Sequence, residues 1–320
     1  MGEVVSMNNV DFNDSYNEHI KNQRLALNGG FAAIFAAGSM VIIKAVAYFM
    51  SGSNSILASL IDSVTDTAIS VLTVFSIRYS MKPADEDHRH GHGKIEGVSA
   101  LFQGAMLAGG ALFLCLEAVK NIVKPEEISH HGVSAIMIAI CIALTFALVG
   151  YQNYVVKKSK SLAIEADKAH YKGDLYMNAG VLGIVLIDFF GGPHWLDPVF
   201  ALVVAAILTH SSIDVAKKAM DMLMDRELPE DERAEIMAII QAHSEVLDTH
   251  DLRTNKSGMN IFISFDIELE PLLSLKQAHD IARSVELELL DRFINAEIMI
   301  HMDPAGSEAD TRHKVAGVHH

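Results

Sequence analysis

The sequence predicts a membrane domain of six transmembrane helices followed by a small α+β domain. The chain has 320 residues, of which 50% are hydrophobic, and its mean hydropathy is +0.26. These values are high for a soluble protein. The excess lies before about residue 220, in runs close to the ~20 apolar residues that a helix needs to cross a bilayer. The remainder is charged and mixed, as in a soluble domain.

The membrane domain is expected at residues 25–220, after a polar segment at 1–24 that is predicted to be loosely ordered and partly helical. Lys and Arg gather in this segment and in alternate loops, and by the positive-inside rule both termini are then cytoplasmic. Polar loops separate the apolar runs. In order, the six expected helices are Gly29–Met50, Ile56–Tyr79, Val98–Val119, Val133–Tyr154, Ala166–Phe190 and Leu196–Ile213.

Residues 221–304 have the patterns of a small two-layer domain. Three acidic residues open its first helix and suit the positive end of a helix, and Ser274 is the expected cap of the second. Alternating apolar residues indicate strands with one buried face. The predicted order is αββαβ, at Pro229–His243, Leu247–Thr254, Asn260–Leu269, Ser274–Phe293 and Glu297–His301. Residues 305–320 lack a pattern and are expected to be disordered.

Charge and cysteine content narrow the classes of partner. The formal net charge of −15 argues against nucleic-acid binding and suits a protein that handles cations. Cys115 and Cys141 lie in apolar segments and are interpreted as small buried hydrophobes, with no disulfide framework.

Two short stretches in the apolar part repeat one spacing, in which an ionisable residue is followed four positions later by Asp. They are Asp62 with Asp66, and His170 with Asp174. On a helix, positions i and i+4 share a face, so two facing helices would bring three carboxylates and one imidazole together. Such ligands suit a tetrahedral divalent cation such as Zn²⁺. An N-cap or a solvated turn could explain either pair alone, but hydrocarbon offers no solvent to ionisable groups.

Two further groups of residues could bind metal. The loop Asp85-Glu86-Asp87-His88-Arg89-His90-Gly91-His92-Gly93-Lys94 holds three histidines and three acids, although a solvated loop without metal is the alternative. In the C-terminal domain, ionisable residues fall at strand edges or helix starts, but spacing alone does not show that they converge. They are His250, Asp266, His279, His301 and Asp303.

Together these motifs resemble the cation diffusion facilitator family, in particular its bacterial YiiP/FieF type of zinc and iron exporter. The resemblance rests on the two membrane pairs, on the loop that ends in His92-Gly93-Lys94, and on the closing stretch Ile300-His301-Met302-Asp303-Pro304. It covers about residues 25–304. It implies a homodimer in the bacterial inner membrane, with six helices per protomer and a regulatory cytoplasmic domain similar to metallochaperones.

The resemblance also implies roles for individual residues. Asp62, Asp66, His170 and Asp174 would form the transport site, and Asp85, His88 and His92 a loop site. His250, His279, His301 and Asp303 would contribute to a two-metal cluster at the dimer interface, while Lys94 and Asp225 match an ion pair between the domains. Two departures concern the cytoplasmic cluster, because Asp266 replaces a histidine of the family and Met302 replaces a glutamine. That cluster would bind one metal less, bind more weakly, or prefer another ion.

The expected function is therefore export of Zn²⁺, or of Cd²⁺, Fe²⁺ or Mn²⁺, in exchange for protons by alternating access. The ligands bind metal only when deprotonated, and His170 titrates in the physiological range. A membrane metal sensor that does not transport is the main alternative, and flux measurements would distinguish the two. An intramembrane metalloenzyme ranks lower, because the sequence offers no general base such as the Glu of an HExxH motif. We therefore expect no enzymatic activity.

Overall fold

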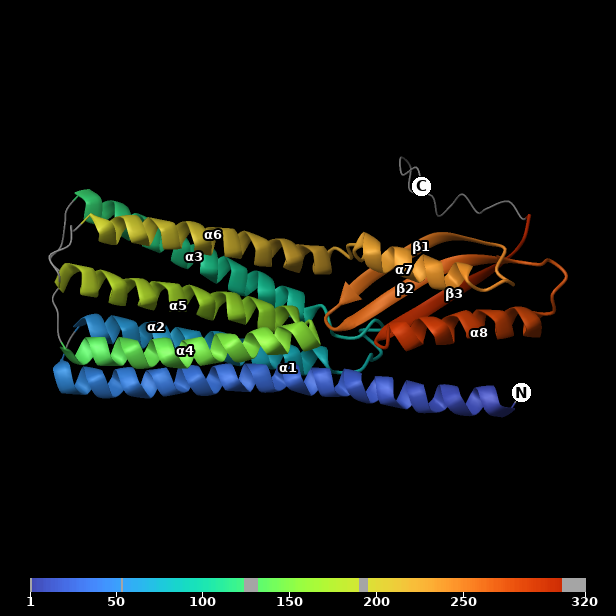
Figure 1. Ribbon diagram of the computed structural model, residues 1–320, viewed down its shortest axis with the longest axis horizontal. Helices are drawn as coiled ribbons and strands as arrows, with labels where there is room; N and C mark the ends of the chain where they lie inside the picture. Colours follow the sequence, from blue (N-terminus) through green and yellow to red (C-terminus); the bar gives the residue numbers. More distant parts are fainter. Residues whose placement is uncertain (1, 53, 124–131, 190–194, 307–320) are drawn as a thin grey trace. The chain divides into compact units, whose positions relative to one another are not determined.

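The computed structural model describes residues 2–52, 54–123, 132–189 and 195–306 (Figure 1). The chain divides into two compact units. The first contains residues 22–223, and the second contains the residues before 22 together with those from 224 onward. Disorder is expected at residues 305–320. Of these, residues 307–320 lie outside the described part of the chain.

The first unit is built from long helices that run up and down in chain order (Figure 1). They are α1 (Gly2–Ser51), α2 (Asn54–Ser80), α3 (Ile95–Val123), α4 (Gly132–Ser159), α5 (Leu162–Phe189) and α6 (Leu196–Leu223). Each of the six expected spans coincides with one of these helices. The lead-in is more regular than expected, because α1 begins at Gly2 and runs unbroken through the first apolar run. Once a helix is nucleated, adding residues is inexpensive, so a stable apolar segment can extend into polar sequence.

Five of the described helices are long and apolar enough to cross a membrane. These segments are Asn17–Met50, Ser59–Ser80, Ile95–Val123, Ile136–Ser159 and Leu196–Leu223. The remaining long helix, α5, has 28 residues but carries several charged side chains in its first half. Much of that half is buried, with Ile164, Asp167 and Tyr171 fully enclosed, so α5 is an interior helix whose polar groups are shielded by its neighbours.

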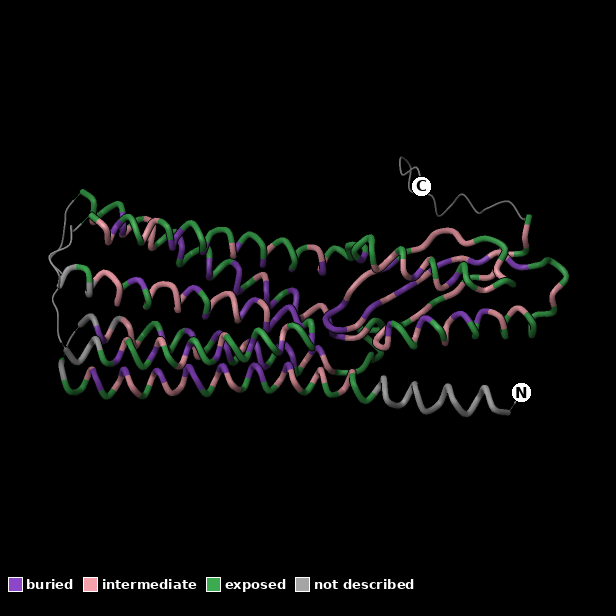
Figure 2. The backbone as a smooth tube through the Cα atoms, viewed as in Figure 1, coloured by how far each residue is buried: buried purple, intermediate pink, exposed green. Residues whose placement is uncertain are grey.

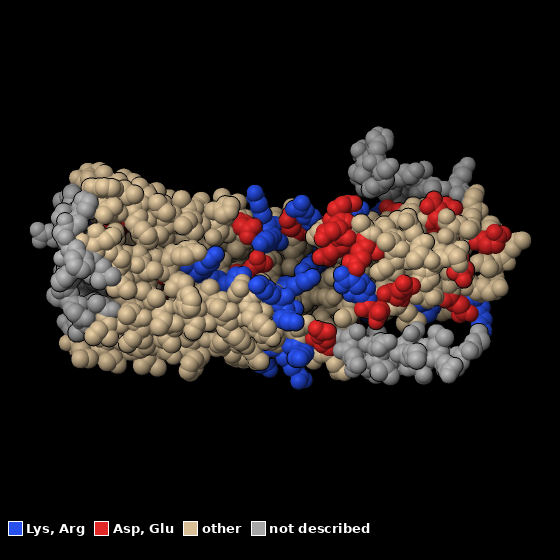
Figure 3. Space-filling model, viewed as in Figure 1, with Lys and Arg blue, Asp and Glu red and all other residues tan. Residues whose placement is uncertain are grey.

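The surface of the helical unit fits a lipid environment. Large apolar side chains point outward, among them Phe35, Phe49, Phe113 and Phe146. Buried positions lie on the sides of the helices that face their neighbours (Figure 2). On the face shown in Figure 3, the helical unit carries few charged side chains along most of its length. Lys and Arg gather at the end where α2, α4 and α6 finish. Exposed apolar bodies with charge at the ends are typical of membrane-spanning bundles.

The second unit is a three-stranded sheet covered by two helices. Its elements are α7 (Glu230–Gln241), β1 (Asp248–Ser257), β2 (Asn260–Leu269), α8 (Leu275–Arg292) and β3 (Ala296–Pro304). This matches the predicted αββαβ order. The strand order is β1-β2-β3, with β1 antiparallel and β3 parallel to β2. Alternate residues of β2 are buried, and Ile263, Phe265 and Ile267 pack with α7 and α8 in one core.

The start of α8 confirms the expected cap. The Ser274 hydroxyl accepts a hydrogen bond from the backbone of Gln277, whose side chain in turn accepts one from the Ser274 backbone. This capping box satisfies two amide groups that the first turn of a helix leaves unpaired.

Candidate metal sites

The helical unit brings an imidazole and two carboxylates together between α2 and α5. His170 Nε2 lies 2.9 Å from Asp66 Oδ1 and 3.7 Å from Asp174 Oδ2. One ligand atom from each of the three residues lies within 4.8 Å of the others. The exposed fractions of these side chains are 16% for His170 and Asp174 and 6% for Asp66. A nitrogen and two oxygens held this closely can bind either a divalent cation or protons.

Asp62, the fourth residue expected here, is not in this three-residue group. It lies one helical turn before Asp66 on α2, at an exposed position, and its charge interacts with those of Asp66, Lys44 and His170. The i, i+4 spacing therefore places both aspartates toward α5, but at different depths. The structure joins three of the four predicted ligands and leaves the fourth at the edge of the group.

Behind the three-residue group lies a buried hydrogen-bond network that the sequence reasoning missed. The Asp167 carboxylate, one turn before His170, accepts hydrogen bonds from Gln152 (2.7 Å), Thr73 (3.3 Å) and Ser70 (3.5 Å). The hydroxyls of Ser70 and Tyr171 are 2.7 Å apart. These bonds tie α5 to α2 and α4 and so fix the rotation of the helix that presents His170. Asp167 itself was the available signal, since it is a further acid inside the expected span at Ala166–Phe190.

A second buried carboxylate anchors the start of α5. Glu96 on α3 accepts hydrogen bonds from the Ser80 hydroxyl (2.9 Å), the Ser161 hydroxyl (2.5 Å) and the Ala163 backbone. Negative charge at a helix N-terminus is stabilised by the helix dipole. Glu96 thus links the end of α2 to the first turn of α5, and so connects the two helices that carry the candidate metal ligands.

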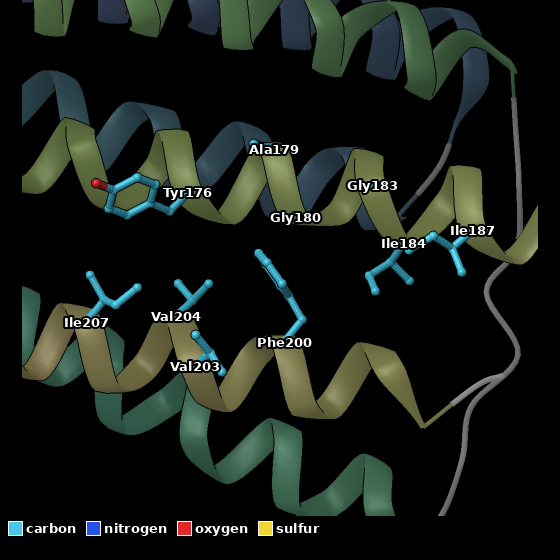
Figure 4. Close-up of a pocket in the computed structure, with 10 residues that line it drawn as sticks. All are labelled: Tyr176, Ala179, Gly180, Gly183, Ile184, Ile187, Phe200, Val203, Val204 and Ile207. Atoms are coloured by element: carbon cyan, nitrogen blue, oxygen red, sulfur yellow. The ribbon is translucent and has the colours of Figure 1, made fainter. Parts of the chain in front are cut away.

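Beyond Asp174, α5 and α6 border an apolar crevice of about 410 Å³ (Figure 4). Its lining includes Tyr176, Gly180 and Gly183 from α5 and Phe200 from α6. A Cβ atom on Gly180 would overlap the Phe200 ring, so only glycine permits this close approach. Among the described residues, no carboxylate or imidazole lines the crevice.

The loop between α2 and α3 forms the second predicted group. Asp85, His88 and His92 each offer a ligand atom within 4.8 Å of the others. Asp85 Oδ1 lies 3.3 Å from His88 Nδ1, and Asp85 Oδ2 lies 3.2 Å from His92 Nε2. Gly91 has φ +72°, a conformation that favours glycine and lets the chain turn between the two histidines.

Hydrogen bonds and burial fix the geometry of the loop group. The backbone N–H of His88 donates to Asp85 at 2.7 Å, which holds the pKa of that carboxyl below its ordinary value. His92 is buried, and within the described residues its Nδ1 atom has no hydrogen-bond partner. An ionised carboxylate beside two imidazoles is a suitable ligand set for a divalent cation.

The sheet assembles part of the predicted cytoplasmic cluster. His250, Asp266 and Asp303 each offer a ligand atom within 4.8 Å of the others, and His301 Nε2 lies 3.2 Å from Asp303 Oδ1. The strand register explains this, because His250, Asp266 and His301 are paired across β1, β2 and β3. Burial raises the pKa of the Asp266 carboxyl, while the nearby histidines oppose that effect. His279, on α8, is exposed and lies outside the three-residue group.

Local backbone geometry aims His250 at its neighbours. The β1–β2 register shifts between His250 and Arg253, and Asp251 in this irregularity has φ +53°. Such bulges redirect side chains at sheet edges. Sequence reasoning missed Glu268, whose Oε1 lies 3.8 Å from His250 Nε2. Its position two residues after Asp266 on one strand places both on the same face and was the available signal.

The predicted ion pair between Lys94 and Asp225 would join the two units, and it stays a prediction. Lys94 directly precedes α3, and Asp225 follows α6 with φ +56°. The Asp225 carboxylate accepts a hydrogen bond from Asn255 within the second unit.

Comparison with known proteins covers both units. Residues 30–224 match the transmembrane domain of cation efflux proteins, and residues 228–305 match the cytoplasmic domain of the same proteins. The chain is 39% identical to the cation-efflux pump FieF of Klebsiella pneumoniae, over 88% of this chain and 94% of the relative. It is 40% identical to FieF of Yersinia enterocolitica, over 91% and 96% of the two chains.

Two similar solved structures correspond to about a quarter of the chain. One is the proposed zinc transporter CzrB in its zinc form, with 28% identity over 27% of this chain and 98% of that one, and a TM-score of 0.25. The other is the metal-bound C-terminal domain of the CzcD transporter from Thermotoga maritima. It has 28% identity over 26% of this chain and 100% of that one, and a TM-score of 0.24. The family assignment rests on the sequence relatives and the two domain matches rather than on these solved structures.

Proposed function

The chain belongs to the cation diffusion facilitator family, as a member of the YiiP/FieF type, and from this premise we propose that it exchanges cytoplasmic Zn²⁺ for external protons. Efflux of divalent metal cations across a bacterial membrane follows from the family. Zinc as the cargo and proton antiport as the mechanism are our proposals. Cd²⁺, Fe²⁺ and Mn²⁺ are the other candidate cargoes.

The observation that carries this proposal is the position of His170 Nε2 between Asp66 and Asp174 on α2 and α5. Nitrogen with carboxylate oxygen is a ligand set that Zn²⁺ accepts, whereas Mg²⁺ and Ca²⁺ prefer oxygen alone. The same three atoms bind protons when the cation leaves, so metal and protons compete for one site. In alternating access, metal would displace protons on the cytoplasmic side, and external protons would displace metal on the other.

Asp62 is proposed as the fourth ligand. It is one turn from Asp66 on the same helix face, so a small shift of α2 along α5 would bring its carboxylate to the bound cation. Flux through an Asp62→Ala variant tests this role. Wild-type flux in that variant would remove Asp62 from the ligand set.

The sheet cluster is proposed to serve regulation. Metal at His250, Asp266 and Asp303, together with His279 and His301, would neutralise repulsion between the acidic cytoplasmic domains of a homodimer and favour a closed state. The loop group at Asp85, His88 and His92 is proposed as a third cation site. Both termini are proposed to be cytoplasmic, in the inner membrane. Distances between spin labels on the two cytoplasmic domains, measured with and without Zn²⁺, would reveal closure.

Flux in proteoliposomes tests the main proposal. Wild type, Asp66→Asn and the control Asp214→Asn are compared under an imposed pH gradient with Zn²⁺, Cd²⁺, Fe²⁺ and Mn²⁺ in turn. Asp214 is a suitable control because it pairs with Lys218 on the surface of α6. We expect metal and protons to move in opposite directions in wild type and in the control. Asp66→Asn should lose more than about 100-fold in rate, since even outer-shell changes at metal sites cost 10–100-fold.

Two results would contradict the proposal. Metal that binds but never crosses the membrane would favour a sensor. Metal flux that leaves the internal pH unchanged would exclude proton antiport.

A further inference from the structure

Lys44 is a buried cation that the transport proposal does not use. It lies in the apolar part of α1 and its exposed fraction is 7%. A charged side chain within a membrane helix is costly, and such residues usually face the bundle interior and serve function. Burial of this charge therefore calls for an explanation from its surroundings.

The contacts of Lys44 connect it to the helix turn that carries the transport aspartates. Its Nζ atom donates to the Ser63 hydroxyl at 2.6 Å and to the Ser59 backbone carbonyl at 3.1 Å. Ser63 directly follows Asp62 and lies three residues before Asp66. The ammonium of this α1 residue is thus held by two neutral oxygen acceptors on α2. The ammonium interacts electrostatically with the carboxylates of Asp62 and Asp174, but it forms no ion pair with either of them.

We propose that the Lys44 ammonium sets the charge of the transport site and thereby its affinity for a divalent cation. This inference rests on the proposed transport function. Three carboxylates at Asp62, Asp66 and Asp174 with a neutral His170 carry three negative charges, and the Lys44 ammonium reduces the excess to two. A divalent cation then balances the charge of the proposed ligands themselves, while the Asp167 carboxylate behind them is held by its own hydrogen-bond donors. Balanced charge is the less costly state in a low-dielectric interior.

The built-in ammonium also favours release of the cargo. A fixed positive charge close to the site repels the bound metal and so weakens binding, which a transporter requires because a cation held too tightly cannot leave. Without that charge the site would hold a divalent cation more tightly and turn over more slowly. Low dielectric strengthens the effect, since one charge in a protein interior acts far more strongly than in water.

A purely structural role is the competing explanation, in which Lys44 only clamps α1 to α2 through hydrogen bonds. Two variants separate the roles. Lys44→Arg keeps the charge, whereas Lys44→Gln keeps a hydrogen-bond donor without it. A third variant, Lys44→Met, removes both and suits an apolar environment. The matched control is Lys172→Met, because Lys172 is exposed on α5 and its ammonium lies over the Tyr176 ring.

The experiment measures Zn²⁺ flux into proteoliposomes as a function of metal concentration, with the full chain. For Lys44→Gln we expect KM to fall by about tenfold or more and the maximal rate to fall as well. Lys44→Arg and Lys172→Met should stay close to wild type. Thermal unfolding in detergent reports whether each variant folds, and Lys44→Met carries the test where the glutamine variant does not fold.

Each outcome has a definite reading. Absence of flux in wild type would contradict the transport function itself. The role of the Lys44 charge would then be tested by Zn²⁺ binding to the same variants, measured by calorimetry, and unchanged affinity in Lys44→Gln would overturn it. Normal wild-type flux with an unchanged or raised KM in Lys44→Gln and Lys44→Met would overturn the role of the charge. Equal losses in the arginine and glutamine variants would identify a structural clamp and overturn it too.

Discussion

In the part of the chain that the structure describes, two clusters combine one histidine with two aspartates, and their surroundings differ. In the helical unit, the side chains of Asp66, His170 and Asp174 are 6–16% exposed and the closest pair of atoms is 2.9 Å apart. On the sheet, the side chains of the other cluster are 23–30% exposed and its closest pair is 3.6 Å apart. Packing and a buried hydrogen-bond network hold the first cluster, whereas the second depends on the strand register and on the β1 bulge at Asp251.

This difference indicates how one ligand chemistry can serve two roles. A buried cluster supported on several helices keeps its geometry while those helices stay in place. It changes when the helices move against each other. A cluster on an open sheet surface keeps one side free for ligands from elsewhere, which suits the proposed contact between two copies of the chain. The variants below are ways to test that distinction.

Loss of the histidine should have the largest effect in the buried cluster. We expect His170→Ala to lose more than about 100-fold in metal flux, because among the described residues this group holds no second imidazole to replace its Nε2. The corresponding His250→Ala should keep its maximal rate within about threefold and change mainly the metal concentration at which transport is half-maximal. Proteoliposome flux measures both. Equal losses in the two variants would show that the clusters do not have separate roles.

The clusters also differ in how far the sequence predicted them. Asp66 and His170 were predictable because the i, i+4 spacing fixes a helix face before any tertiary contact is known. The depth of Asp62 and the bonds of Asp167 were not, because they depend on how α2, α4 and α5 slide and rotate against each other. The six spans and the αββαβ order were predictable from apolar run length and from alternation. The pairing of His250 with Asp266 needed the strand register, which includes a bulge at Asp251.

The network behind His170 should contribute more to stability than any contact of the sheet cluster. Asp167→Ala leaves the Gln152 amide without its acceptor inside the bundle, and we expect the free energy of unfolding to fall by about 3 kcal/mol. Asp167→Asn keeps the shape and an acceptor oxygen, so it should recover part of this loss. Thermal unfolding in detergent measures stability, and KM for Zn²⁺ reports whether His170 is still correctly placed. Full stability in the alanine variant would show that packing alone fixes α5.

The contact of α5 with α6 tests the same dependence on packing. Gly180→Ala places a methyl group against the Phe200 ring, and such overpacking typically costs about 1–3 kcal/mol. Gly183→Ala is the matched control, since no described atom outside its own helical turn lies within 4 Å of the added carbon. We expect a lower unfolding midpoint only for Gly180→Ala. Equal midpoints in both variants would mean that the α5–α6 crevice absorbs the methyl group.

The smallest effect is expected from the ionisation of Asp266 in the sheet cluster. Burial raises the pKa of this carboxyl, so the metal-free protein binds a proton there more readily when folded than when unfolded. The stability that this proton contributes is full below the ordinary pKa of aspartate and is lost as the pH rises through the raised value. Because the site is partly exposed, the change should stay below about 1 kcal/mol.

Hydrogen exchange of the β2 amides in the metal-free full chain, followed from pH 4 to pH 7, measures this change. Asp266→Asn should remove that pH dependence while leaving the fold intact, because the amide has the shape of the protonated carboxyl. Zn²⁺ should act in the opposite direction in wild type, since metal binds the deprotonated carboxylate and so stabilises the sheet more as the pH rises. An unchanged pH profile in Asp266→Asn would show that this carboxyl is not the source of the pH dependence. The Asp266 carboxyl would then affect the sheet only through the metal that it binds.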